Sequence, residues 1–369
     1  SVMRNHTQLR YLINPLNSFY AIGDVIAKPL ERDKGVLDPI GQDARLALPA
    51  HAAPATLIVV VGETARMGNF GINGYERDTT PRLAQAKVIS LRNVWSCGTS
   101  TAASVPCMFS HLGREAFGQR QTNHESLPDV LDRAGLAVLW IDNQSGCKGT
   151  CSRVPNVNTT ALKVSPYCDG SECHDEVMLH GLDRRIAELP AERRARGVVV
   201  FLHQMGSHGP AYHKRVPQAF KRFQPECASN ALQQCAREQV VNAYDNTIVY
   251  TDHFLAETIG WLKQHKGPTA MVYLADHGES LGENNLYLHG LPYAIAPDVQ
   301  KRVPWITWTS PAFVQQRGLR PSCLQDKLNA ALSHDHFFHS LMGITGVRSS
   351  EYRPAMDIYG SCMAAPERS

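Results

Sequence analysis

The chain has 369 residues, of which 43% are hydrophobic and 19% charged, and its formal net charge at pH 7 is +3. These values are near the average for globular proteins, and so small a net charge gives no basis for nucleic acid binding. The length exceeds that at which a single core usually stops growing, so we expect one large domain and an additional segment. Apolar runs such as Leu136–Ile141 are far shorter than the ~20 residues of a transmembrane helix.

Residues 1–53 differ in composition from the rest of the chain. Two arginines near the start precede an apolar and aromatic stretch from Tyr11 to Ile26, and a charged stretch follows from Lys28 to Arg45. We interpret this segment as a connector, and two arrangements fit its pattern. It either packs on the domain as an ordinary extension or forms an amphipathic juxtamembrane segment whose apolar side chains face lipid: Leu16, Phe19, Tyr20 and Ile26.

From Pro54 onward, short apolar runs alternate with longer mixed segments. Five runs have the length and the β-branched content of buried strands: Thr56–Val61, Ala137–Asp142, Val198–His203, Ala270–Asp276 and Val303–Trp308. Between the third and fourth runs, Gln239–Gln264 repeats apolar residues at helical spacing. This alternation predicts an α/β fold in which helices cover both faces of a mostly parallel central sheet.

The ten cysteines fall into close couples along the chain. Four couples are separated by few residues and the remaining two cysteines form a fifth: Cys97 with Cys107, Cys147 with Cys151, Cys168 with Cys173, Cys227 with Cys235, and Cys323 with Cys362. Such spacings predict disulfides and an oxidising compartment, which in a bacterium is the periplasm. Zinc bound by thiolates is the alternative, although the chain lacks paired Cys-x2-Cys motifs.

Side chains that bind metals follow three of the predicted strands. They are Glu63 after the first strand, His203 and His208 at and after the end of the third, and Asp276 and His277 at the end of the fourth. Ligands gather beyond the carboxyl ends of strands in open α/β sheets, so these side chains are expected at one edge. Each of these residues alone fits a turn or a helix cap. The carboxylates of Glu63 and Asp276 and the imidazole of His277 together suit zinc, and they leave the fourth position of the ion for a catalytic group.

Four segments resemble the lipid A phosphoethanolamine transferases, a family that includes the mobile colistin-resistance enzymes and belongs to the alkaline phosphatase superfamily. They are VVGETARMGNFGINGYERDTTPRL from Val60, SCGTSTAASVPCMFS from Ser96, LHQMGSHGPAY from Leu202 and DHGESLGENNLYLHG from Asp276. The resemblance runs from about Arg4 to Cys362 and implies an alkaline phosphatase/sulfatase-like fold. It also implies a transmembrane domain before the segment equivalent to residue 1, and a periplasmic catalytic domain over residues 54–369.

The resemblance further implies that Thr101 is the nucleophile. One tightly bound Zn²⁺ is then held by Glu63, Thr101, Asp276 and His277. The chemistry agrees, because a catalytic zinc ion lowers the pKa of a bound hydroxyl, and because Thr101 precedes a predicted first helical turn whose amides can bind phosphate. The alternative role for Thr101 is that of a helix N-cap.

Five other residues are expected near this site, three from the resemblance and two from their position in the sequence. His208 and His289 match family histidines that hold a second zinc ion or the substrate phosphate, and Lys148 resembles a basic group near the substrate headgroup. We interpret His203 as a residue packed behind the site and Glu279 as part of a turn from which it could orient a ligand.

The implied reaction moves phosphoethanolamine from phosphatidylethanolamine to a phosphate of lipid A through phosphoethanolamine-threonine, which confers polymyxin and colistin resistance. The implied setting is the Gram-negative inner membrane, with a monomeric catalytic domain in the periplasm at the membrane surface. The alternatives are a transferase that modifies lipopolysaccharide core sugars and a related phosphodiesterase. An alternative of another class is a non-catalytic envelope protein that zinc stabilises.

Overall fold

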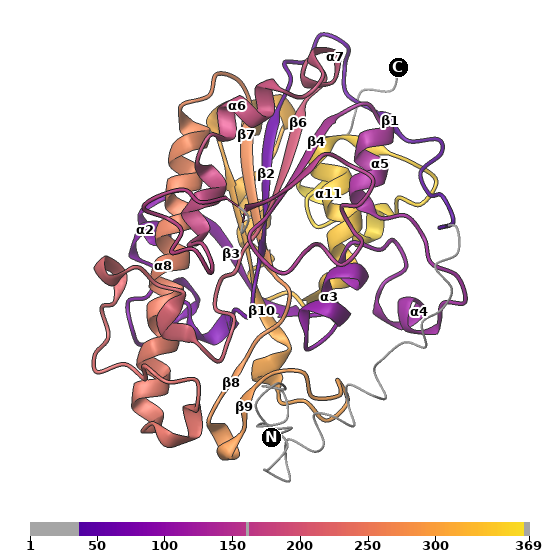
Figure 1. The fold of residues 1–369 in the computed structure, drawn as a ribbon. Coiled ribbons are helices and arrows are strands. Elements are labelled where there is room, and N and C mark those ends of the chain that lie inside the picture. Colours follow the sequence, from indigo (N-terminus) through magenta and orange to yellow (C-terminus); the bar gives the residue numbers. More distant parts are fainter. Residues whose placement is uncertain (1–36, 160–161, 365–369) are drawn as a thin grey trace.

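The computed structural model describes residues 37–159 and 162–364, and an eight-stranded sheet forms its centre (Figure 1). The strand order is β11-β3-β10-β7-β2-β6-β4-β5. The bounds are β2 Thr56–Gly62, β3 Ile89–Trp95, β4 Ala137–Asp142, β5 Asn156–Asn158, β6 Val198–His203, β7 Thr269–Ala275, β10 Arg302–Thr309 and β11 Leu332–Ser333. Only β10 runs antiparallel to its neighbours in this sheet, which confirms the mostly parallel arrangement.

Helices cover both faces of the sheet, as the sequence predicts. Figure 1 shows α8 on one side, and α5 and α11 on the other. The helices are α2 Pro81–Gln85, α3 Thr101–Met108, α4 Arg114–Gln119, α5 Leu127–Arg133, α6 Leu182–Ala187, α7 Ala191–Arg194, α8 Arg237–Lys263, α9 Pro311–Arg317, α10 Pro321–Gln325 and α11 Phe337–Thr345. Among the described residues, no helix combines the length and the apolar character needed to cross a bilayer.

The central strands are buried on both faces. Residues Leu57 to Val61 of β2 are at most 3% exposed, and every residue of β4, β6 and β7 is buried as well. Parallel strands covered by helices on both sides need such continuous apolar sequences, and each buried valine or leucine contributes roughly 1.5–3 kcal/mol. The five predicted strands and the long helix therefore match β2, β4, β6, β7, β10 and α8 within one or two residues at each end.

Two small antiparallel sheets complete the fold. Strand β8 (Ser280–Leu281) pairs with β9 (Tyr287–Leu288), and β1 (Arg45–Leu46) pairs with β12 (Val347–Arg348). Part of the predicted connector thus packs on the domain, while its residues 1–36 lie outside the described residues. The division of the chain at residue 53 stays a prediction.

All ten cysteines are paired in disulfides. The bonds join Cys97 to Cys107, Cys147 to Cys151, Cys168 to Cys173, Cys227 to Cys235, and Cys323 to Cys362. These are the five couples that the spacing predicts, so thiolates are not available to bind zinc. The first bond joins the loop before α3 to the end of that helix.

Candidate active site

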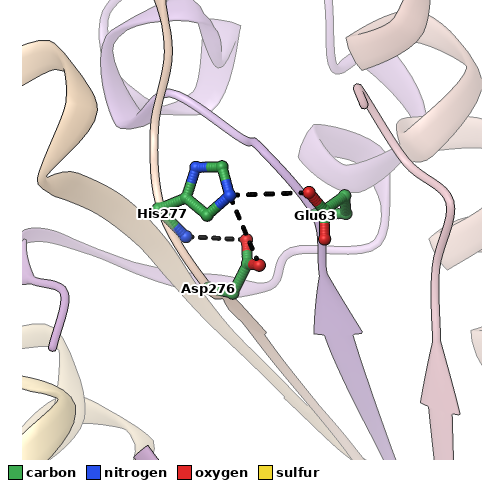
Figure 2. Close-up of side chains that lie close together, drawn as sticks. All are labelled: Glu63, Asp276 and His277. Atoms are coloured by element: carbon green, nitrogen blue, oxygen red, sulfur yellow. Dashed lines mark hydrogen bonds and ion pairs between the residues drawn. The ribbon is translucent and has the colours of Figure 1, made fainter. Parts of the chain in front are cut away.

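Three side chains of the kinds that bind metals meet at the carboxyl edge of the sheet (Figure 2). Ligand atoms of Glu63, Asp276 and His277 all lie within 4.8 Å of one another. The Nε2 atom of His277 is 3.5 Å from Glu63 Oε1 and 3.5 Å from Asp276 Oδ2. All three side chains are completely buried, so their charges are not screened by solvent.

The register of two neighbouring strands brings the carboxylates together. Strands β2 and β7 are parallel, and Gly62 is paired with Ala275. Glu63, which follows β2, and Asp276, which follows β7, therefore lie at the same level of the sheet. Gly62 is required at this point, because a Cβ atom there would lie 2.5 Å from the hydroxyl oxygen of Tyr273.

Thr101 joins this group from the start of α3. Its hydroxyl donates to the carboxylate of Glu63, with Oγ1 lying 3.1 Å from Oε1 and 3.0 Å from Oε2. Ser100 occupies the N-cap position and Thr101 is the first helical residue, so the N-cap alternative for Thr101 is wrong. Ser104, one turn along the helix, donates to the carbonyl oxygen of Asp276 and ties α3 to the end of β7.

The donor set fits a divalent cation such as zinc. Within residues 37–159 and 162–364, Asp276 Oδ2 and His277 Nε2 are buried without a hydrogen-bond partner, although buried polar atoms usually have one. The other ring nitrogen of His277 is hydrogen-bonded to the Gly278 carbonyl oxygen at 2.7 Å, an arrangement typical of zinc-binding histidines. Two carboxylates and one imidazole are ordinary zinc ligands, and the Thr101 hydroxyl lies next to them.

The electrostatics also indicate a need for positive charge. Burial and then the charge of Glu63 raise the pKa of Asp276 to about 7. Burial opposes protonation of His277, but Asp276 and Glu63 overcome this and raise its pKa to about 10. A protonated imidazole offsets the two carboxylates in the absence of a cation, and a divalent ion would supply this charge instead.

His208 and His289 lie beside this group. The ring centroid of His289 is 4.2 Å from that of His277 and 6.1 Å from that of His208. Glu279 holds His289, because Oε1 is 2.8 Å from Nδ1 while Oε2 accepts a hydrogen bond from the Tyr212 hydroxyl at 2.6 Å. Because Nδ1 of His289 is bonded to Glu279, the other ring nitrogen, Nε2, is the one that can bind a ligand. Burial lowers the pKa of His208, which favours its neutral form.

Two other residues considered from the sequence take no direct part in this group. The Nζ atom of Lys148 is hydrogen-bonded to Ser145, at 3.1 Å from its carbonyl oxygen and 2.8 Å from its hydroxyl. His203 has Nδ1 2.9 Å from Asp142 Oδ2 and packs edge-on against Trp140, as expected for a residue behind the site.

Sequence reasoning missed Gln144, whose Nε2 donates to Glu63 Oε2 at 3.0 Å. Its position two residues beyond the end of β4 was the available signal.

Comparison with known proteins identifies the family. A family model described as Sulfatase matches residues 55–347. Phosphoethanolamine transferase EptA of Escherichia coli (strain K12) is 45% identical over 379 residues, covering 100% of this chain and 67% of that protein. The chain belongs to the phosphoethanolamine transferases of the sulfatase family. The family predicted from the four sequence segments is thereby confirmed.

Two further members extend this comparison. Phosphatidylethanolamine transferase Mcr-1 of Escherichia coli is 38% identical over 369 residues, covering 96% of this chain and 65% of that protein. The soluble domain of lipooligosaccharide phosphoethanolamine transferase A from Neisseria meningitidis has 38% identity and a TM-score of 0.84, covering 90% of this chain and 100% of that one. These likenesses confirm the fold class and show that the chain is a transferase of phosphoethanolamine.

Proposed function

We propose that this transferase takes phosphoethanolamine from phosphatidylethanolamine and adds it to a phosphate of lipid A, with zinc as cofactor and Thr101 as nucleophile. The observation that carries the proposal is the hydroxyl of Thr101, which points at Glu63 beside Asp276 and His277. The names of two relatives support the substrates, since one names phosphatidylethanolamine and the other lipooligosaccharide, which contains lipid A.

Glu63, Asp276 and His277 would hold one Zn²⁺ tightly, with the Thr101 hydroxyl in the fourth position. Such an ion lowers the pKa of the hydroxyl and offsets charge on the phosphoryl oxygens. Asp276 Oδ2 and His277 Nε2 support this assignment, because both are buried and neither has a hydrogen-bond partner in the part of the chain that the structure describes.

In the first step, Thr101 Oγ1 forms a bond to the phosphorus of phosphatidylethanolamine while the bond to the diacylglycerol oxygen breaks. The proton of the threonine hydroxyl ends on that oxygen, so diacylglycerol leaves as an alcohol and phosphoethanolamine-threonine remains. In the second step, a phosphate oxygen of lipid A forms a bond to the same phosphorus while the bond from that phosphorus to Thr101 Oγ1 breaks. The proton that the lipid A phosphate loses ends on Oγ1, which restores the threonine hydroxyl.

His208 and His289 bind the oxygens of the transferred phosphate or hold a second zinc ion during the reaction. Glu279 supports this role because it fixes the ring of His289 beside that of His277. Lys148 approaches the substrate headgroup when its contacts with Ser145 open. Each positive or hydrogen-bonding group at the phosphoryl oxygens lowers the barrier to transfer electrostatically.

The proposed setting is the periplasmic side of the Gram-negative inner membrane, where the chain acts as a monomer. Five disulfides support an oxidising compartment. An ethanolamine group adds a positive charge to a lipid A phosphate, so cationic polymyxins such as colistin bind the modified surface more weakly. Resistance to these antibiotics is the expected consequence.

Mass spectrometry of lipid A from a Gram-negative host that expresses the full-length protein tests this proposal. We expect lipid A that carries phosphoethanolamine, and unmodified lipid A in the matched host that expresses the Thr101→Ala variant at the same level. If lipid A is unchanged while core sugars gain the group, the core-sugar transferase is correct. Release of phosphoethanolamine to water would favour a phosphodiesterase, and no reaction at all would favour a non-catalytic protein.

A further inference from the structure

Thr64, the residue directly after Glu63, has an unusual backbone conformation. Its φ angle is +55°, and its side chain is completely buried. A positive φ is unfavourable for a β-branched residue, because the branched side chain crowds the backbone. Strained residues of this kind persist only where surrounding contacts hold them, and they gather at functional sites.

The contacts of Thr64 reach both carboxylates of the site. Its backbone N–H donates to Asp276 Oδ1 at 3.1 Å, and its hydroxyl donates to Glu63 Oε1 at 2.7 Å. One residue thereby bonds to two carboxylates that follow different strands. Oδ1 of Asp276 also accepts from the backbone N–H of His277 at 2.7 Å, so the oxygen that faces the imidazole of His277 is Oδ2, which has no hydrogen-bond partner among the described residues.

Tyr244 of α8 holds the strained turn from the other side. Its buried hydroxyl donates to the carbonyl oxygen of Thr64 at 2.6 Å and accepts from the backbone N–H of Arg66 at 2.8 Å. These two bonds lie on either side of Ala65, so the turn cannot relax without breaking at least one of them. The tyrosine therefore links the longest helix to the loop that carries Glu63.

We propose that Thr64, held by Tyr244, is a positioning residue that sets Glu63 and Asp276 in their cation-binding arrangement before the cation binds. The inference rests on the proposed function, because it assumes zinc at these carboxylates. Groups that orient metal ligands through hydrogen bonds contribute about 10- to 100-fold to metal affinity in other proteins. The hydroxyl of Thr64 acts on Glu63 and its backbone conformation acts on Asp276.

Titration of Zn²⁺ into the metal-stripped 369-residue chain, followed by calorimetry, tests this role. Thr64→Val removes the hydroxyl but keeps the branched shape, and we expect the dissociation constant for zinc to rise at least ~10-fold. Thr64→Ser keeps the hydroxyl, and we expect it to bind zinc within about threefold of the parent. This pair of variants separates the hydrogen bond to Glu63 from the packing of the side chain.

Tyr244→Phe provides a second variant that leaves the loop sequence unchanged, and it carries the test if Thr64→Val does not fold. We again expect weaker zinc binding by at least ~10-fold. The matched control is Tyr250→Phe, because Tyr250 is buried on the same helix and its hydroxyl is hydrogen-bonded to Glu176 instead. Its zinc affinity should equal that of the parent.

Two results would overturn the inference, and only one of them would also overturn the proposed function. If the parent chain binds zinc and Thr64→Val and Tyr244→Phe bind it equally tightly, Thr64 has no positioning role, while the proposed function stands. If the parent chain binds no zinc, both the inference and the zinc-dependent function are wrong.

Discussion

Asp175 is a buried carboxylate whose two oxygens accept four hydrogen bonds from N–H groups. Oδ1 accepts from Asn143 Nδ2 at 2.9 Å and from the backbone of Met205 at 2.8 Å. Oδ2 accepts from Gln204 Nε2 at 3.2 Å and from the backbone of Gly206 at 2.9 Å. These bonds join the loop after β4 to the loop after β6, which leads to His208.

We predict that Asp175→Asn destabilises the chain substantially. An asparagine has one oxygen and one NH₂ group, so in either orientation the NH₂ group faces two N–H donors of the protein. Each buried donor left without an acceptor costs about 1–3 kcal/mol, which gives a loss of roughly 2–6 kcal/mol. Asp252→Asn is the matched control, because the oxygens of Asp252 accept one backbone N–H each, from Leu83 and Arg82.

The free energy of unfolding in urea, measured with intact disulfides, gives the comparison. The measurement belongs at pH 8, since burial raises the pKa of Asp252 to about 6 and its carboxylate must be ionised. Asp252→Asn leaves one N–H donor without an acceptor and Asp175→Asn leaves two. The loss in the free energy of unfolding should therefore be about twice as large for Asp175→Asn. An equal or smaller loss of unfolding free energy in Asp175→Asn would show that the number of donors left without an acceptor does not set the loss.

Two further predictions concern the histidines. His208→Ala and His289→Ala should each leave about one tightly bound zinc per chain by elemental analysis while transfer falls by at least ~10²-fold, because these residues act on phosphate or a second ion. Loss of all zinc in either variant, or normal transfer in both, would contradict this division. Burial lowers the pKa of His334 from 6.5 to about 4, so the folded chain keeps it neutral while the unfolded chain binds a proton below pH 6.5. Stability should therefore fall as the pH drops from 6.5 to 4, and less steeply in His334→Gln, which does not titrate; equal slopes in thermal unfolding would exclude a contribution from His334.

The sequence was sufficient to predict the central strands and the edge at which the site lies. Residues 57–61 and their equivalents in the neighbouring strands are continuous apolar runs, and the carboxyl ends of parallel strands must meet at one edge. Strand β3 escaped prediction because its polar residues Arg92 and Asn93 interrupt the apolar pattern, and β11 has only two residues.

The contacts of Thr64 and Tyr244 could not be predicted, because they join distant parts of the chain. Thr64 is 212 residues from Asp276 and 180 residues from Tyr244 in sequence. No local pattern records which hydroxyl meets which carbonyl oxygen after folding. The positive φ of Thr64 is likewise a product of those contacts, since the sequence alone favours a negative φ for threonine.

Peptide mapping by mass spectrometry after incubation of the full-length protein with phosphatidylethanolamine, without an acceptor, tests the central claim most directly. We predict a phosphoethanolamine group on Thr101, an adduct on the serine of Thr101→Ser, and none in Thr101→Ala. Undiminished transfer by Thr101→Ala, or an adduct on a different residue of the parent protein, would contradict Thr101 as the nucleophile.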